Sequence, residues 1–470
     1  MTSATLARGR VATGVFRFGA PLALGMVLHG SFNLVDMFMV GRLPEGSAAL
    51  AALGLCDMLA ALATIVSNGV STASVALVSR HHGAGERTPL RRMVWQSLVL
   101  VGLLSVGFGL FGIFGSDLLV RGLMLAKGQV ASLAVSYLEV MLGGCFSIFF
   151  LLQVTALLRA LGHAKTAAGL LVGGNVLNLL LDVFFVFGAG PVPAFFGWGP
   201  PIAAALGIPR LGVVGAAWAT LIGRSVPVLI GLGLLARRKG GPRFHRAYLK
   251  PRWREISTIL HMAWPSSLEL MLRVAAILAF LALIASRFTT AADPSVLSAY
   301  AICLRLEMMV LFVSLGWGAA ASSYVGTNLG AAKPRRAKSA GYWAALFGAL
   351  SALLMVGLYV EYSRPIMAFF DAEPSVATVG HEYLVSVGPS YLLLAVGVVF
   401  SQAMAGAGAT RLSLWLDAGV LWLLVVPAAI TLALAFDIPH TTLFRIMAAG
   451  NLLGALIFFV AYVQGGFLRT

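Results

Sequence analysis

TAAGLLVGGNVLNLLLDVFFVFG, residues 166–188, is a run of apolar and small residues long enough to cross a lipid bilayer as a helix. Three polar side chains interrupt it, and these are Asn175, Asn178 and Asp182. Their spacings of three and four residues place them on one helix face. A carboxylate in such a segment costs about 2.5–3.5 kcal/mol on insertion scales. We therefore expect an ion or proton site inside a membrane protein.

The composition is that of an all-α membrane protein with many spans. Of the 470 residues, 59% are hydrophobic and 11% are charged, and the mean hydropathy is +0.92. A soluble protein of this length could not bury so much apolar surface. The apolar segments are continuous and not alternating, which excludes a transmembrane β-barrel. The three cysteines lie far apart without metal-ligand spacing, and we interpret them as packing residues.

The net charge of +16 does not indicate a nucleic-acid partner, because the basic residues are distributed over short loops and form no single basic domain. No cleavable signal peptide is evident, since no clear A-x-A site ends the first apolar segment. That segment is expected to remain as the first span.

Twelve apolar segments are predicted to cross the bilayer, and this lipid environment is the first expected partner. Loops on one side hold 23 of the Lys and Arg residues and loops on the other side hold 6, which predicts that both termini are cytoplasmic. The approximate limits of the segments are 15–41, 48–79, 93–115, 131–157, 166–188, 211–235, 257–286, 296–326, 340–360, 378–403, 412–435 and 441–465.

The chain divides nearly in half at a basic loop. We expect an N-lobe of six helices (1–235), a basic cytoplasmic linker (236–256) and a C-lobe of six helices (257–470). Three pairs of landmarks recur at offsets of 244, 247 and 246 residues: Pro21 with Pro265, Gly83 with Gly330, and Gly162 with Gly408. These pairs favour a duplicated six-helix unit whose copies are related by an axis along the membrane normal. The alternative is a chance coincidence of loops rich in small residues.

Several stretches together resemble the multidrug and toxic compound extrusion (MATE) transporters. They are PLALGMVLHGSFNLVDMFMVGRL (21–43), ASVALVSRHHGAGE (73–86), ALLRALGHAKT (156–166), NVLNLLLDVFFVFG (175–188), LGVVGAAWAT (211–220) and SSYVGTNLGAAKPRRAK (322–338). The resemblance implies two pseudo-symmetric lobes around a central cavity. It also implies an antiporter, not an enzyme, that confers drug resistance by exporting hydrophobic, often cationic, organic compounds as H⁺ or Na⁺ enters. The expected setting is the inner membrane of a prokaryote, with a monomeric protein and no cofactor beyond the ion.

The family's cation-coupling residues in the N-lobe match Asp36, Asn178, Asp182 and Thr220. Another branch of the family has carboxylates in the C-lobe, where this chain has Arg273 and Ala409. Because an arginine repels a metal cation, the resemblance places the ion site in the N-lobe.

The residues themselves leave the coupling ion open. If Asp36 and Asp182 approach each other, one proton would neutralise the pair and its loss would open a cation site. Asp, Asn and Thr oxygens also suit Na⁺. A purely structural carboxyl is the alternative interpretation at each position. Possible secondary members of the site are Asn33, Asn175, Asp57, Glu269 and Arg273.

Other charged residues within the spans have more than one interpretation. Glu269 and Arg273 are four residues apart on one helix and are expected to pair directly, as a structural pair or as part of a gate. Arg224 is expected to extend to the membrane interface, and Asp417 to lie near a span end in contact with water.

Met26, Met37, Phe149 and Phe150 are candidates for a substrate cavity, because Met repacks easily and aromatic faces attract cations. The alternative is ordinary helix packing. Two other functions remain: a lipid-linked precursor flippase, which would need a strongly cationic cavity and more helices, and an intramembrane transferase. The chain shows no loop Asp pairs, no His–Asp dyad and no nucleotide-binding motif, which disfavours the transferase and an ATP-driven pump.

Overall fold

The computed structural model describes residues 6–7, 9–43, 46–237, 248–290, 293–370, 373–436 and 438–469, apart from the side chains at 33, 34, 37, 47 and 469. These residues are mostly helical, and none of them forms a strand. Eleven of their helices are long and apolar enough to cross a membrane, and one bent pair supplies a twelfth span. The prediction of an all-α protein with twelve spans is confirmed. Residues 238–247 of the predicted linker lie outside the described residues.

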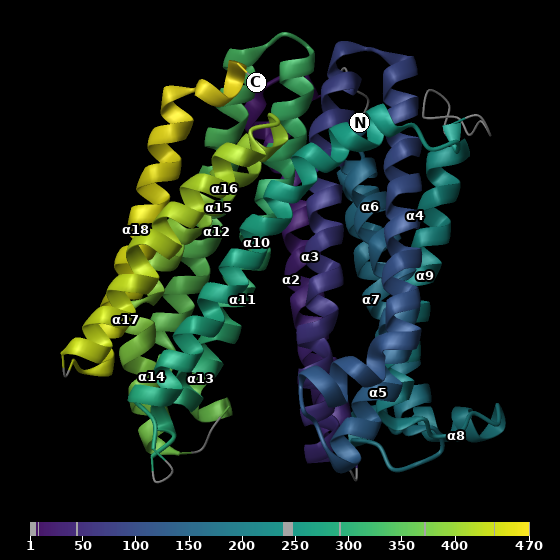
Figure 1. Cartoon of the computed structure of the whole chain (residues 1–470), viewed down its shortest axis with the longest axis vertical. Coiled ribbons are helices and arrows are strands. Elements are labelled where there is room, and N and C mark those ends of the chain that lie inside the picture. The colour runs from purple at the N-terminus through teal and green to yellow at the C-terminus, as the bar shows by residue number, and fades with distance from the viewer. Residues whose placement is uncertain are drawn as a thin grey trace.

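The first half of the chain forms one group of helices (Figure 1). Its bent span breaks by 42° between α5 and α6, where Gly143 and Gly144 adjoin. The elements are α2 (Val11–Gly41), α3 (Gly46–Ala84), α4 (Arg87–Asp117), the π-helix η1 (Leu118–Leu123), α5 (Gly128–Gly143), α6 (Phe146–Ala160), α7 (Ala164–Phe187), η2 (Ala194–Phe196), α8 (Gly199–Ala205) and α9 (Gly212–Arg237).

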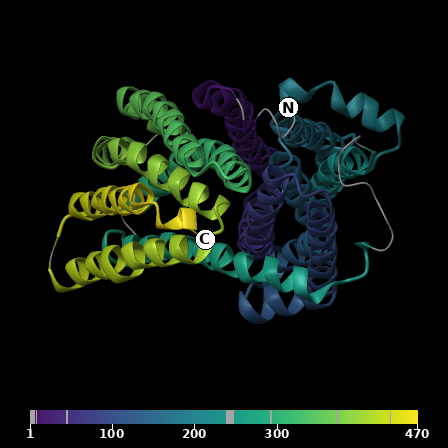
Figure 2. The same ribbon diagram turned by 90° about the horizontal axis from the view of Figure 1, so that it is seen from above.

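The second half forms the other group, and Figure 2 shows the two groups side by side when seen from above. One of its spans, α16–η5–α17, contains a π-helix in its middle. The elements are α10 (Trp253–Arg287), α11 (Ser295–Gly330), α12 (Pro334–Glu361), α13 (Ser363–Phe370), α14 (Pro374–Ser386), η4 (Gly388–Ser390), α15 (Tyr391–Gly406), α16 (Thr410–Ala418), η5 (Gly419–Val425), α17 (Val426–Ala435), α18 (His440–Gln464) and η6 (Gly466–Arg469).

The two groups meet near the end that carries both termini and diverge toward the other end (Figure 1). Glycines mark the contact. Gly83 on α3 lies against the backbone of Thr327 on α11, and Gly330 on α11 lies against the backbone of Arg80 on α3. A Cβ at either glycine would overlap those backbone atoms. The contact continues along α2 as far as Gly30, which lies against Phe312.

Because Gly83 has no room for a side chain, we predict that Gly83→Val separates the groups at the end that carries the termini. Spin labels are placed at Arg87→Cys and Arg335→Cys, one exposed position in each group. Pulsed electron paramagnetic resonance should then show a population with a longer distance between the two labels than in the protein that retains Gly83. The three native cysteines are buried, so that labelling should be confined to the new sites. Gly107→Val is the control, because Gly107 faces open space. Unchanged distances in Gly83→Val would contradict this interpretation of the contact.

Candidate functional site in the N-lobe and a polar cluster in the C-lobe

The polar face of α7 is buried against α9, and small residues allow this close approach. Gly223 on α9 lies against the backbone of Asn178, where an added Cβ would come within 2.8 Å of the Asn178 side chain. This approach brings Thr220, one turn earlier on α9, to the polar face of α7. Asn178, Asp182 and Thr220 are 7%, 1% and 8% exposed, respectively. The burial means that their polar groups must satisfy one another.

Asn178 links the other two residues through its amide nitrogen. Its Nδ2 donates to Asp182 Oδ2 at 3.0 Å and to Thr220 Oγ1 at 3.3 Å. The carboxyl group of Asp36 on α2 lies near that of Asp182 and interacts with it electrostatically. Two ionised carboxylates at such a place repel each other, and a proton or a cation would relieve that repulsion. The structure thus brings together the four residues that the resemblance indicates.

The guanidinium of Arg224 lies near the acidic groups of this site. Arg224 on α9 interacts through its charge with Asp36, Asp57 and Tyr137. The prediction that Arg224 extends to the membrane interface is therefore wrong, because the guanidinium interacts with the acidic groups Asp36 and Asp57 of the N-lobe interior. Arg224 follows Thr220 by four residues on one helix, so a helical-face argument could have found it.

Asn175 belongs to a different contact from Asn178. Its Oδ1 lies 3.2 Å from Nδ1 of His29 on α2, a residue that the sequence reasoning missed. The His29 ring also packs edge-to-face on Phe312 of the other lobe, with centroids 6.0 Å apart. His29 therefore connects the polar face of α7 to the interface between the lobes. The side chain of Asn33, another predicted member, lies outside the described residues.

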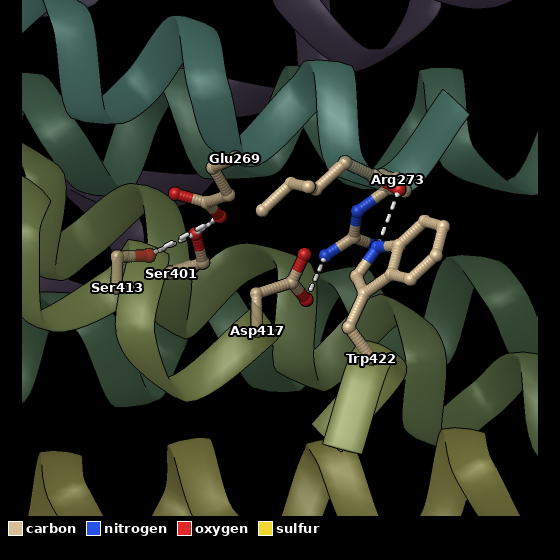
Figure 3. Close-up of polar contacts among 7 residues, drawn as sticks. Glu269, Arg273, Ser401, Ser413, Asp417 and Trp422 are labelled. Carbon is tan, nitrogen blue, oxygen red and sulfur yellow. Dashed lines mark hydrogen bonds and ion pairs between the residues drawn. The ribbon is translucent and has the colours of Figure 1, made fainter. Parts of the chain in front are cut away.

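Charged residues also gather in the C-lobe, between α10 and the α16–η5 segment (Figure 3). Nη2 of Arg273 donates to Oδ1 of Asp417 at 2.6 Å. The expectation that Asp417 lies in contact with water at a span end is wrong, since the residue is 6% exposed. The π-helix that follows it continues the span, so Asp417 lies within the helical segment and not beside its end. Trp422 of that π-helix donates to the carbonyl of Leu272, one residue before Arg273.

Glu269 faces two hydroxyl groups (Figure 3). Its Oε1 accepts hydrogen bonds from Ser401 at 2.8 Å and from Ser413 at 3.2 Å. The expected direct pairing of Glu269 with Arg273 is corrected, because Arg273 instead bonds to Asp417, 144 residues away. In the C-lobe the guanidinium of Arg273 is thus paired with the carboxylate of Asp417. This guanidinium already supplies the positive charge that a metal ion would bring to Asp417.

The aromatic and methionine candidates for a cavity lie in different surroundings. Phe149 is fully buried and packs against Phe108, so it belongs to the N-lobe core and not to a cavity wall. Met26 and Phe150 are half-buried beside a small apolar cluster of α6, α7 and α9. The side chain of Met37 lies outside the described residues. Among the residues that are described, no group of three or more His, Cys, Asp and Glu side chains is arranged to hold a metal ion.

Comparisons with known proteins agree on one family. The sequence profile described as MatE matches residues 21–184 and 265–431, two matches that begin 244 residues apart. The chain is 24% identical to the probable multidrug resistance protein YpnP of Bacillus subtilis, over 89% of this chain and 88% of that protein. It is also 24% identical to a protein of Shewanella oneidensis named FAD transporter, over 90% and 87% of the two chains.

Solved structures show the same fold. One is described as the outward-facing conformation of a multidrug resistance MATE family transporter, with 23% identity, a TM-score of 0.87 and coverage of 100% of this chain and 99% of that chain. Another, of a MATE protein in the bent conformation, has 23% identity and a TM-score of 0.85, covering 100% and 98% of the two chains.

The buried pair in the C-lobe predicts a large cost for removing one partner. We expect Arg273→Met to lower the free energy of unfolding by about 3–5 kcal/mol, because Asp417 is left as a buried unpaired charge. The double variant Arg273→Met/Asp417→Leu should recover most of that loss. Thermal unfolding in detergent provides the measurement. Arg121→Met is the control, since its pair with Asp117 is largely exposed and should contribute little. Equal losses in the single and double variants would contradict the prediction.

Proposed function

Because the chain belongs to the MatE family, whose members are transporters and not enzymes, we propose that it is a secondary active antiporter driven by protons. Its cargo is hydrophobic, often cationic, organic compounds, which it exports as H⁺ enters. The multi-span architecture supports transport across a bilayer. Relatives named as multidrug resistance proteins support this cargo class.

The observation that carries this proposal is the buried carboxyl of Asp182, bonded to Asn178 and facing the charge of Asp36. Two neighbouring carboxyl groups in a buried place do not both stay ionised unless a cation lies between them, and otherwise one of them takes up a proton. Protonation of one carboxyl removes the repulsion without any further ligand, which supports H⁺ as the coupling ion.

Two further features favour a proton over Na⁺. The Asn178 side chain directs its NH₂ group, and not its carbonyl oxygen, toward Asp182 and Thr220. A sodium ion at this place would require oxygen ligands, and hence a reversed amide. In addition, Arg224 already supplies a positive charge next to Asp36 and Asp57. The positive charge of this guanidinium reduces the attraction of the site for a metal cation.

The transport cycle follows from the two charge states of the pair. With one proton shared, the pair has a single negative charge, which Arg224 offsets. When that proton leaves, the two ionised groups repel each other and α2 moves relative to α7. Cargo that binds better to one arrangement than to the other shifts the populations, and by linkage it changes the affinity for the proton.

The orientation is part of the proposal. The Lys and Arg split between the loops supports a cytoplasmic position for both termini, in the inner membrane of a prokaryote. The lobes are in contact at that end and diverge at the other (Figure 1), an arrangement that supports an outward-facing conformation. We also propose that one chain is the functional unit, surrounded by lipid.

We predict that Asp36→Asn and Asp182→Asn each lower the transport rate at least tenfold while the protein still folds and inserts, since an amide cannot release the shared proton. Asp117→Asn, an exposed aspartate, is the matched control. Purified variants in proteoliposomes should be assayed for ethidium transport with pH and Na⁺ gradients imposed separately, and for flavin dinucleotide as a second cargo. Transport driven at full rate by a Na⁺ gradient alone would contradict proton coupling.

The role of Arg224 yields a separate prediction. Arg224→Gln should make transport respond to Na⁺, because the carboxylates of Asp36 and Asp57 then lack their resident cation. Arg224→Lys retains the charge and should remain insensitive to Na⁺. The rate with and without Na⁺, at fixed pH gradient, distinguishes the outcomes. The interpretation fails if folded Arg224→Gln protein shows no Na⁺ effect or if both variants behave alike.

A further inference from the structure

A pocket of about 420 Å³ lies in the C-lobe, at the end that carries both termini. Its residues are distant in sequence from Asp36 and Asp182. It lies between the first part of α10, the start of α16 and the segment that follows α18. Its lining residues are His261, Met262, Gly408, Ala409, Thr410, Arg411, Leu412, Gly466 and Phe467. These residues include two basic side chains and no acidic one, so the pocket favours an anionic group.

Two contacts hold the Arg411 guanidinium in place. Its Nη2 donates to Nδ1 of His261 at 3.3 Å, and its central carbon lies 5.9 Å from the ring centroid of Trp264. Since Nδ1 of His261 accepts this bond, the neutral ring has its proton on Nε2, where it remains available as a donor. The remaining guanidinium N–H groups and Nε2–H together form a set of donors that suits a phosphoryl group.

The immediate surroundings of this basic site are apolar and exposed. Trp264, Leu412 and Trp415 are 44%, 38% and 68% exposed. In a chain of membrane-spanning helices such side chains contact lipid, and Trp is typical of the headgroup level. The site therefore combines an anion-binding head with a lipid-facing apolar flank, which is the arrangement of a phospholipid's own headgroup and acyl chains. A free phosphate or a nucleotide would make no use of that flank.

We propose that this pocket binds the phosphoryl headgroup of an anionic phospholipid. Arg411 and His261 contact the phosphate, and the glycerol and acyl chains lie along Leu412 and Trp264. The same helix, α16, carries Ser413 and Asp417, which bond to Glu269 and Arg273 of α10. A lipid bridging His261 on α10 and Arg411 on α16 strengthens the attachment of these two helices at one end.

The test uses the purified full chain in detergent and measures lipid retention by native mass spectrometry. The probes are phosphatidylglycerol, phosphatidylcholine of matched chains, and inorganic phosphate as competitor. We expect preferential retention of phosphatidylglycerol, reduced about fivefold in Arg411→Gln and further in Arg411→Gln/His261→Ala. Arg335→Gln is the matched control, because Arg335 is an exposed arginine at the same end that does not line the pocket.

Each outcome bears on the proposal. Equal retention of both lipids, or an equal loss in the Arg335→Gln control, would overturn it. Displacement of phosphatidylglycerol by millimolar inorganic phosphate would indicate a general anion site and would overturn the lipid assignment. A further expected result is a rise in the thermal unfolding midpoint on adding phosphatidylglycerol, seen in the wild-type chain and lost in Arg411→Gln. Because none of these readouts measures transport, failure here leaves the proposed antiport unaffected.

Discussion

The electrostatic interaction between the neighbouring carboxyl groups of Asp36 and Asp182 is the constraint around which the N-lobe is arranged. Two neighbouring acidic groups within a membrane-spanning bundle require compensation, and the surrounding helices provide it. Asn178 donates from α7 itself, while α9 supplies Arg224 nearby and Thr220 at the amide. The close approach of α9 at Gly223 is what allows these groups to meet. A proton fits this environment better than a metal ion because the donors and the positive charge are already present.

The two lobes give different chemistry to corresponding positions. Eight residues after Pro21, α2 carries His29, and eight residues after Pro265, α10 carries Arg273. Each nitrogen base contacts a later helix of its own lobe: His29 contacts Asn175, and Arg273 contacts Asp417. The C-lobe contact is an ion pair between a guanidinium and a carboxylate, whereas the N-lobe contact is between a neutral amide and an imidazole. A cation of the protein therefore already occupies this position in the C-lobe and not in the N-lobe.

Sequence patterns predicted the parts of this structure that depend on short spacing. Twelve spans follow from apolar length, and Asn178 with Asp182 follows from helical periodicity. Long-range contacts were less accessible. The partner of Arg273 lies 144 residues away and not at the neighbouring Glu269, and the partner of His29 lies 146 residues away. Asp417 looked like a span-end residue because it lies close to the start of its predicted span, 412–435, and its partner Arg273 lies on a distant helix. Arg224 was placed wrongly because its nearby acidic and phenolic groups come from other helices and could not be read from the sequence around it.

The most direct test of this account is infrared spectroscopy of the carboxyl groups at neutral pH. If Asp36 and Asp182 share a proton, the wild-type chain has a protonated-carboxyl C=O band that disappears in both Asp36→Asn and Asp182→Asn and persists in Asp117→Asn. A wild-type spectrum that loses no protonated-carboxyl intensity in either variant would contradict the shared proton and, with it, the proposed coupling.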